Sequence, residues 1–343
     1  MTTRNLLFSA ALLMVSLIVS LIVGEIGLRL LGYAGAPESL ISNIRHVDDP
    51  ILNWRFVPNS TMQDGNVIVH YNSAGFRDAE HAVERLAHVT RVVVVGDSVT
   101  EGSGVKQGEL FTSYVQALLG SRYEIINLGM SGLNTPQEIH ILDVEGMKYA
   151  PDIVVVNFIL NDCDFFSELY AAERFQKKKD EKIGLLGDIT IDPRLKRWLK
   201  SSAFVYFVKG RMEYLQGVIT GKEEKNYYVS LWDSPECHRR VLAGFDALKA
   251  LQEHSRFDVH VLIWPLLMNY ERYGFSPVHV WVKENAVQRG FKVLDLLPVY
   301  SSRRYRDLQV TAEDNVHPNG EGHRLSAQAY VDWIRQSTTL SSH

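Results

Sequence analysis

Three residue types that together carry out acyl transfer occur in this chain at positions suited to chemistry. Ser98 stands in Gly96-Asp97-Ser98, directly after the run Val92-Val93-Val94-Val95, and Asp314 precedes His317 by three residues. A serine hydroxyl is a weak nucleophile until a base takes its proton, and histidine is suited to that task. One local turn can bring Asp314 to the imidazole Nδ1–H, which leaves Nε2 facing the serine. The spacing predicts Ser98 as nucleophile, His317 as base and Asp314 as the acid that orients the base.

The elements around these residues must bring them to one edge of a sheet. Successive valines predict a central parallel strand that is buried on both faces, and Ser98 then lies at its carboxyl end, where open α/β sheets bind ligands. From Arg91 onward, strand and helix patterns alternate, which predicts a three-layer α/β/α fold with a five-stranded parallel sheet. The predicted strands are 91–95, 123–127, 152–158, 259–264 and 292–296. The predicted helices are 109–119, 136–149, 238–254, 277–289 and 319–336.

Four short blocks of the sequence together resemble the SGNH (GDSL-type) hydrolase superfamily, whose blocks carry a Ser, a Gly, an Asn and an Asp-x-x-His in this order. The blocks are Gly96-Asp97-Ser98, Asn127-Leu128-Gly129-Met130-Ser131-Gly132, Asn161-Asp162 and Asp314-Asn315-Val316-His317. The resemblance covers the chain from about Val89 to the C-terminal helix. It implies a flavodoxin-like sheet and a serine esterase that needs no cofactor. The Gly-x-Ser-x-Thr sequence around Ser98 also differs from the Gly-x-Ser-x-Gly elbow of the α/β-hydrolases.

The resemblance further implies an oxyanion hole. Its donors are the backbone N–H groups of Ser98 and Gly132 and the side-chain amide of Asn161. A glycine suits the second position because a missing Cβ lets the backbone approach a substrate oxygen closely. The third block usually reads Gly-x-Asn-Asp, and here Ile159 stands in place of that glycine. In the alternative interpretation, Ile159 shifts the loop so that the Asn161 amide braces Asp162 and the sheet edge and takes no part in the reaction.

Other polar residues near the blocks have structural explanations. We expect Asp97 to order the turn before the serine and Asp162 to brace the loop of Asn161. Asp143 and Glu145 are expected on a helix face, and His323 on the surface of the last predicted helix.

The composition excludes several function classes. Lys and Arg number 36 against 40 Asp and Glu, a net charge of −4, and no basic face supports a nucleic-acid partner. The 12 histidines show no His-Glu-x-x-His spacing, and 2 cysteines cannot build a zinc site, so no metal is expected. Cys163 and Cys237 either pair, if the domain is exported, or remain two free thiols.

The N-terminus carries a long apolar segment. Arg4 and Glu25 bracket twenty uncharged residues, enough for a helix of about 30 Å that spans the hydrocarbon core. A cleavable signal peptide is the competing interpretation, because Ala34-Gly35-Ala36 imitates a cleavage site, but the run is long and Pro37 would follow the cut. We predict an uncleaved anchor with the catalytic domain exported, on the periplasmic or extracellular face.

The remaining segments complete a predicted domain plan. Residues 1–33 form the anchor and its interfacial extension, 34–88 a linker and a short β-hairpin turning at Asp64-Gly65, and 89–343 the catalytic domain. The segment Asn72 to Asp78 resembles one that precedes this domain in membrane-anchored bacterial members, and a surface hairpin without a chemical role is the simpler explanation. The interval 164–235 breaks the alternation and predicts a helical cap over the catalytic crevice. Its run Lys177-Lys178-Lys179 is expected to be a solvated face.

The blocks therefore predict an esterase acting on acyl, chiefly O-acetyl, esters of a small molecule or polysaccharide. Two alternatives remain open. One is an O-acyltransferase that passes the acyl group to a hydroxyl of an exported polysaccharide. The other is a membrane-tethered carbohydrate-binding module that kept the fold and lost activity.

Overall fold

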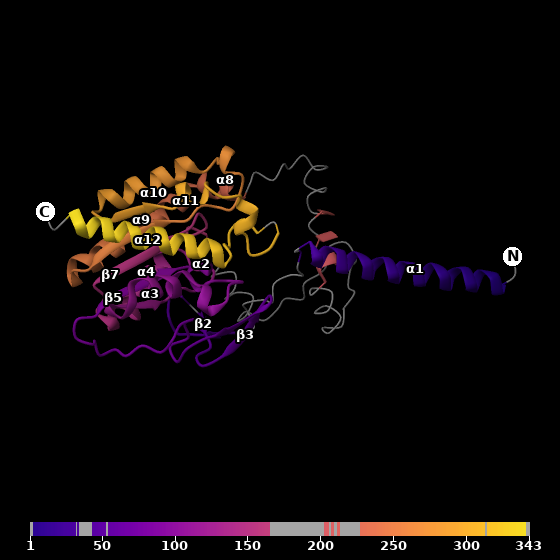
Figure 1. The fold of residues 1–343 in the computed structure, drawn as a ribbon, viewed down its shortest axis with the longest axis horizontal. Coiled ribbons are helices and arrows are strands. Elements are labelled where there is room, and N and C mark those ends of the chain that lie inside the picture. Colours follow the sequence, from indigo (N-terminus) through magenta and orange to yellow (C-terminus); the bar gives the residue numbers. More distant parts are fainter. Residues whose placement is uncertain are drawn as a thin grey trace. The chain divides into compact units, whose positions relative to one another are not determined.

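The computed structural model describes residues 3–31, 33, 43–52, 54–164, 202–205, 207–208, 211–212, 227–312 and 314–340. The chain divides into two compact units. The first comprises Met1–Ser39 with Lys179–Lys225, and the second Leu40–Lys178 with Asn226–His343. Figure 1 shows the ribbon of the whole chain.

The second unit is built on a five-stranded parallel sheet in the order β6-β5-β7-β8-β9. Its strands are β5 (Thr90–Gly96), β6 (Tyr123–Asn127), β7 (Ile153–Phe158), β8 (Asp258–Ile263) and β9 (Lys292–Asp295). The predicted sheet is confirmed, and each strand end lies within one residue of its prediction. Because β6 and β7 flank β5 on opposite sides, the strand order reverses beside β5, and a ligand crevice is expected at the carboxyl end of this pair.

The valine run of β5 is apolar throughout because both of its faces are covered. Val93 and Val95 pack in one core cluster, and Val92 and Val94 pack in another on the opposite face. The first cluster receives buried side chains from α4 (Thr135–Val144), α9 (Pro235–Ser255) and α10 (Ser276–Gln288). The second receives them from α3 (Phe111–Leu119) and α12 (Gly320–Leu340). The helices thus form the two outer layers of an α/β/α fold (Figure 1).

The helix that follows β6 begins at Thr135, one residue before its predicted start, and ends earlier than predicted. Asn134 caps α4 in a reciprocal capping box with Gln137, and Pro136 occupies the first turn. The predicted helix 136–149 ends instead at Val144 and continues as a 3-10 turn, Gly146–Tyr149. At Gly146 a Cβ would lie 2.8 Å from Leu142 Cδ1, so the chain passes close against its own helix there.

The segment before the sheet forms two antiparallel hairpins that contribute to the core. The first pairs β1 (Ile44–His46) with β2 (Trp54–Phe56), and the second pairs β3 (Thr61–Asp64) with β4 (Val67–His70). The turn expected at Asp64-Gly65 is confirmed. The linker predicted before Trp54 is shorter than expected, because Ile44 and Leu52 are buried in the first core cluster.

The first unit contains the apolar N-terminal helix α1 (Thr3–Leu30). Residues Ala11–Leu30 are long and apolar enough to cross a membrane, and a signal sequence would meet the same criterion. The Glu25 carboxylate accepts hydrogen bonds from Ser202 Oγ at 2.8 Å and from the Phe204 N–H at 2.9 Å. Most of the predicted insertion, including Lys177 to Lys179, lies outside the described residues, so the cap over the crevice stays a prediction.

Candidate active site

Ser98 begins the single-turn helix α2 (Ser98–Glu101), immediately beyond β5. Asp97 is the N-cap, and its Oδ1 accepts the Val99 N–H at 2.9 Å. The helix ends at Gly102, a left-handed residue with φ +90° whose N–H donates to the Ser98 carbonyl at 2.9 Å. The serine is therefore held on a short, capped turn at the carboxyl end of the central strand.

The predicted base and acid meet this serine. His317 Nε2 lies 2.9 Å from Ser98 Oγ, and His317 Nδ1 lies 2.9 Å from Asp314 Oδ2. The spacing of three residues works because Asp314 Oδ1 also accepts the backbone N–H groups of Val316 and His317, at 3.0 and 2.9 Å. The same carboxylate thus shapes the turn and binds the imidazole. With Nδ1–H donating to Asp314, Nε2 is free to accept the serine proton.

Backbone hydrogen bonds fix the loop that carries His317 to neighbouring segments of the chain. The Leu267 N–H donates to the Asn315 carbonyl at 2.7 Å, and the Val310 N–H donates to the His317 carbonyl at 3.1 Å. Gln309 and Pro318 form an isolated antiparallel bridge around it. These backbone bonds hold the imidazole opposite Ser98, although the two residues are far apart in the sequence.

The pKa values of His317 and Asp314 are shifted in the directions expected for a base paired with an anion. Burial alone would lower the pKa of His317, but the hydrogen bond and the negative charge of Asp314 raise it above the ordinary value. Burial would raise the pKa of Asp314, and the hydrogen bonds and charge of His317 hold it below its usual range. Asp314 therefore remains ionised while His317 gains and loses a proton.

The two other predicted oxyanion donors come from the loops that follow β6 and β7, the neighbours of β5. Gly132 is half-buried and has φ +79°, a left-handed conformation that favours glycine. Its loop lies beside the end of β5, since the Met130 N–H donates to the Gly96 carbonyl at 3.1 Å. The Asn161 amide Nδ2 donates to Asp97 Oδ2 at 2.9 Å. Asn161 and the serine therefore share Asp97 as a neighbour.

Asp97 does more than the turn-ordering expected of it. Oδ1 caps α2, while Oδ2 lies 3.1 Å from Ser98 Oγ and accepts the Asn161 amide at 2.9 Å. One carboxylate oxygen thus lies beside both Ser98 and the Asn161 amide. An Nδ2 group carries two hydrogens, so the second remains available for a substrate oxygen.

Ile159 adopts a backbone conformation that does not require glycine. Its φ is not positive, and its side chain is buried in the core. The Ile159 N–H donates to Asp162 Oδ2 at 2.8 Å, and the Asp162 N–H donates to the Ile159 carbonyl at 3.0 Å. Asp162 braces this loop, as its position predicted.

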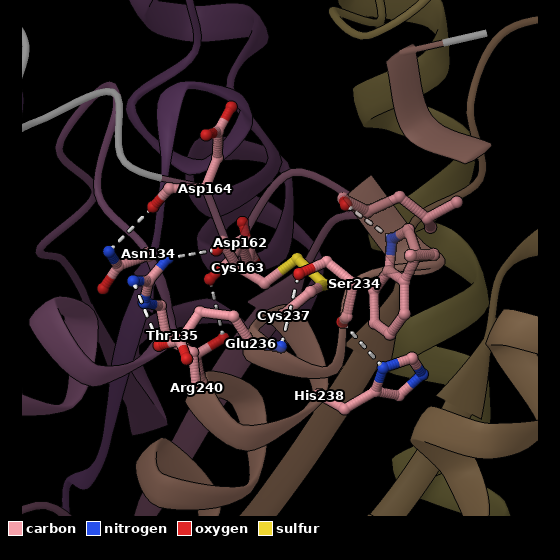
Figure 2. Close-up of a disulfide and its surroundings, with 12 residues drawn as sticks. Asn134, Thr135, Asp162, Cys163, Asp164, Ser234, Glu236, Cys237, His238 and Arg240 are labelled. Atoms are coloured by element: carbon pink, nitrogen blue, oxygen red, sulfur yellow. Dashed lines mark hydrogen bonds and ion pairs between the residues drawn. A yellow bond between two sulfur atoms is a disulfide. The ribbon is translucent and has the colours of Figure 1, made fainter. Parts of the chain in front are cut away.

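A disulfide between Cys163 and Cys237 ties the same loop to α9 (Figure 2). The Cα atoms lie 4.8 Å apart, and the bond joins residues separated by 74 positions. Thr135 at the start of α4 donates its N–H to the Asp162 carbonyl at 2.6 Å, and Asn134 Nδ2 donates to the Asp164 carbonyl at 2.9 Å. Of the two states left open for the cysteines, the structure contains the pair.

Two buried carboxyl groups lie close enough to Asp97 to interact with its charge. Glu138 on α4 and Asp162 are both fully buried, and neither Glu138 oxygen nor Asp162 Oδ1 has a hydrogen-bond partner among the described residues. Burial, followed by their mutual repulsion and that of Asp97, raises the pKa of Asp162 well above its usual value. Burial, followed by the charge of Asp97, does the same to the pKa of Glu138. Both acids are therefore neutral over a wider pH range than exposed carboxyl groups.

One expectation about a peripheral residue was wrong. His323 is only 1% exposed, because α12 turns it inward to accept the Phe111 N–H on Nδ1 at 3.0 Å. Burial lowers its pKa to about 3, so it is a neutral core histidine. Asp143 agrees with its helix-face assignment and is exposed on α4. Glu145, expected on the same helix, instead lies just past its end and pairs with Arg55 and Lys148. Within the described part of the chain, no group of three His, Cys, Asp or Glu residues is placed to hold a metal.

The sequence matches a known family over most of the region described above. The model of the GDSL-like Lipase/Acylhydrolase family matches residues 94–325. The chain belongs to this family. All the predicted site residues of this GDSL-like acylhydrolase fall inside the matched range, and the membership makes the protein a hydrolase of ester bonds. No curated protein sequence matches it significantly.

Solved structures resemble this GDSL-like acylhydrolase at low identity. An acetyl xylan esterase, AlAXEase, is 12% identical with a TM-score of 0.41, covering 71% of this chain and 99% of that chain. A putative lipolytic protein of the G-D-S-L family from Desulfitobacterium hafniense DCB-2 is 13% identical with a TM-score of 0.41, covering 70% and 97%. A carbohydrate acetylesterase family member from Sinorhizobium meliloti is 14% identical with a TM-score of 0.40, covering 72% and 98%.

Proposed function

We propose that this GDSL-like acylhydrolase is a serine esterase that cleaves O-acetyl or other short acyl esters through an acyl-Ser98 intermediate. The observation that carries the proposal is the continuous chain Ser98 Oγ to His317 Nε2, and His317 Nδ1 to Asp314, with 2.9 Å at each step. Both distances allow a proton to move without any rearrangement of the side chains.

The reaction then follows from the geometry. His317 Nε2 takes the Ser98 proton as Oγ attacks the ester carbonyl, and the imidazolium that forms is stabilised by Asp314. The negative charge that develops on the carbonyl oxygen is met by the N–H groups of Ser98 and Gly132 and by the amide of Asn161. The imidazolium protonates the leaving alkoxide, so the ester C–O bond breaks. In the second half, His317 takes a proton from water as the water oxygen attacks the acyl carbon. The imidazolium then returns that proton to Ser98 Oγ as the acyl C–Oγ bond breaks, which releases the carboxylic acid and free Ser98.

We also propose that helix α1 anchors the enzyme and that its catalytic domain lies outside the cytoplasm. The 20-residue span Ala11–Leu30, which is long and apolar enough to cross a membrane, supports the anchor. The Cys163–Cys237 disulfide supports the location, because disulfides persist in oxidising compartments. An acylated exported carbohydrate is the substrate class that such a location makes accessible.

The decisive experiment is hydrolysis of 4-nitrophenyl acetate by the wild type and by Ser98→Ala. We expect a loss of at least about 10³-fold in turnover, because no other group replaces the nucleophile. Ser301→Ala is a matched control that removes an exposed hydroxyl, bonded to the Pro298 carbonyl at 3.1 Å, and spares the nucleophile. Retention of more than about a tenth of the activity by Ser98→Ala would contradict the proposal. Adding a sugar acceptor distinguishes hydrolysis from acyl transfer.

A further inference from the structure

A buried glutamate connects the nucleophile's helix to the loop of the second oxyanion donor. Glu101 is the last residue of α2 and is 2% exposed. Its Oε2 accepts the backbone N–H of Ser131 at 2.9 Å and also the Ser131 hydroxyl. Ser131 immediately precedes Gly132. The carboxylate therefore binds the residue whose peptide bond carries the predicted oxyanion N–H.

Close packing against α2 restrains the loop of Gly129 to Gly132 in addition to this contact. At Gly129 a Cβ would lie 2.3 Å from the Glu101 backbone nitrogen, so the loop passes directly against α2. Gly132 itself is left-handed, with φ +79°. The Gly132 N–H belongs to the planar peptide unit that begins at the Ser131 Cα, so fixing the Ser131 N–H and hydroxyl leaves only the ψ torsion of Ser131 to set its direction.

The other oxygen of Glu101 is held by a tyrosine from outside the catalytic fold. Tyr71 follows the β3-β4 hairpin, is 3% exposed, and donates its hydroxyl to Glu101 Oε1 at 2.5 Å. Its ring stacks on Phe56 with centroids 4.4 Å apart. Two oxygens of one carboxylate thus join the N-terminal segment to the oxyanion loop.

Arg77 supports the same junction with a positive charge. It is 1% exposed, and its Nη1 donates to the Gly102 carbonyl at 2.5 Å, while Nη2 donates to the Val105 carbonyl. Burial raises the pKa of Glu101, and the bonds from Ser131 and Tyr71 and the charge of Arg77 oppose that effect. The segment 72–78, for which a surface hairpin is the simpler explanation from sequence, buries Gly75, Phe76 and Arg77, and Arg77 contacts the end of α2.

We propose that Tyr71 and Glu101 are positioning residues that orient the Gly132 N–H toward the oxyanion, so that the segment before the catalytic domain completes the oxyanion hole. The inference rests on the proposed function, in which Gly132 is an oxyanion donor. A restraint of this kind acts on the transition state, where the charge develops, more than on substrate binding.

The test compares two tyrosine-to-phenylalanine variants that each delete one buried, hydrogen-bonded hydroxyl. Tyr71→Phe removes the bond to Glu101 and keeps the ring on Phe56. Tyr330→Phe removes a bond of 2.9 Å to His260 Nδ1, in the core between α12 and β8, and serves as the matched control. We expect Tyr71→Phe to lower kcat on 4-nitrophenyl acetate by about tenfold with KM changed less than about twofold, and Tyr330→Phe to leave both constants near wild type.

Amide hydrogen exchange over residues 128–133 provides a readout that does not depend on activity. Tyr71→Phe and Glu101→Gln should speed exchange there by about tenfold, and Tyr330→Phe should not. Unchanged exchange in this loop, or a kcat for Tyr71→Phe equal to that of Tyr330→Phe, would overturn the inference. A wild type without esterase activity would instead refute the proposed function, and the exchange data would still decide whether Tyr71 and Glu101 hold the loop.

Discussion

At the scale of single residues, the proposed mechanism makes the pKa of His317 set the pH at which the enzyme works. His317 must be neutral to accept the serine proton, so activity falls as the pH drops through its raised pKa. Asp314→Asn removes the charge that raises this pKa. We expect the acid limb of the kcat/KM profile to move to lower pH and the plateau to fall by about 10²- to 10⁴-fold. A limb that stays in place would show that Asp314 does not control the base.

Asn161 is the residue whose chemical and structural roles most need separation, because its amide is bonded to Asp97. If its second amide hydrogen meets the oxyanion, Asn161→Ala should lower kcat by about 10²- to 10³-fold with little change in KM. Kinetics and a thermal melt on this variant decide. A fall in kcat of tenfold or less, together with a loss of about 5 °C in melting temperature, would mark Asn161 as a brace of its loop.

At the scale of elements, Glu138 within α4 and Glu145 just past its end have opposite effects on stability. The pKa of Glu138 is raised by burial, so its contribution to stability is present below the ordinary Glu pKa and is lost as the pH rises through the folded-state value. Glu138→Gln should therefore gain melting temperature over the wild type by an amount that grows from pH 5 to pH 9, reaching about 5 °C.

Glu145, at the end of the same helix, is the matched control. Burial would raise its pKa, but the bonds and charges of Lys148 and Arg55 lower it, so its stabilisation is present above the ordinary Glu pKa and is lost as the pH falls. Glu145→Gln should cost stability at pH 7 and approach the wild type near pH 3 in thermal melts. The same pH trend in both variants would show that neither effect comes from the carboxylate that was replaced.

At the scale of the whole molecule, α1 decides where the esterase resides. Since Ala11–Leu30 can cross a membrane and Pro37 disfavours cleavage, the mature protein should stay with membranes after a carbonate wash and keep its original N-terminus. Fractionation and N-terminal sequencing measure both properties. A variant that lacks residues 1–33 serves as the control and should appear in the supernatant. A mature chain that begins near Pro37 would show that this helix is a signal peptide.

Local sequence determined the sheet and the identity of the proposed catalytic groups. The apolar run of β5 requires two covered faces, and a carboxylate three residues before a histidine needs only one turn to bind it, so both features could be predicted without tertiary structure.

Tertiary structure decided the contacts that depend on residues far apart in the sequence. Glu101, Tyr71 and Ser131 meet only after the chain has folded, and Asp97 could be recognised as a cap but not as the partner of Asn161. His323 was misplaced for the same reason, because one helical position does not reveal which face a neighbouring element will cover. The cysteine pairing likewise required the return of α9 to the loop after β7, a contact between segments too far apart for any local pattern to encode.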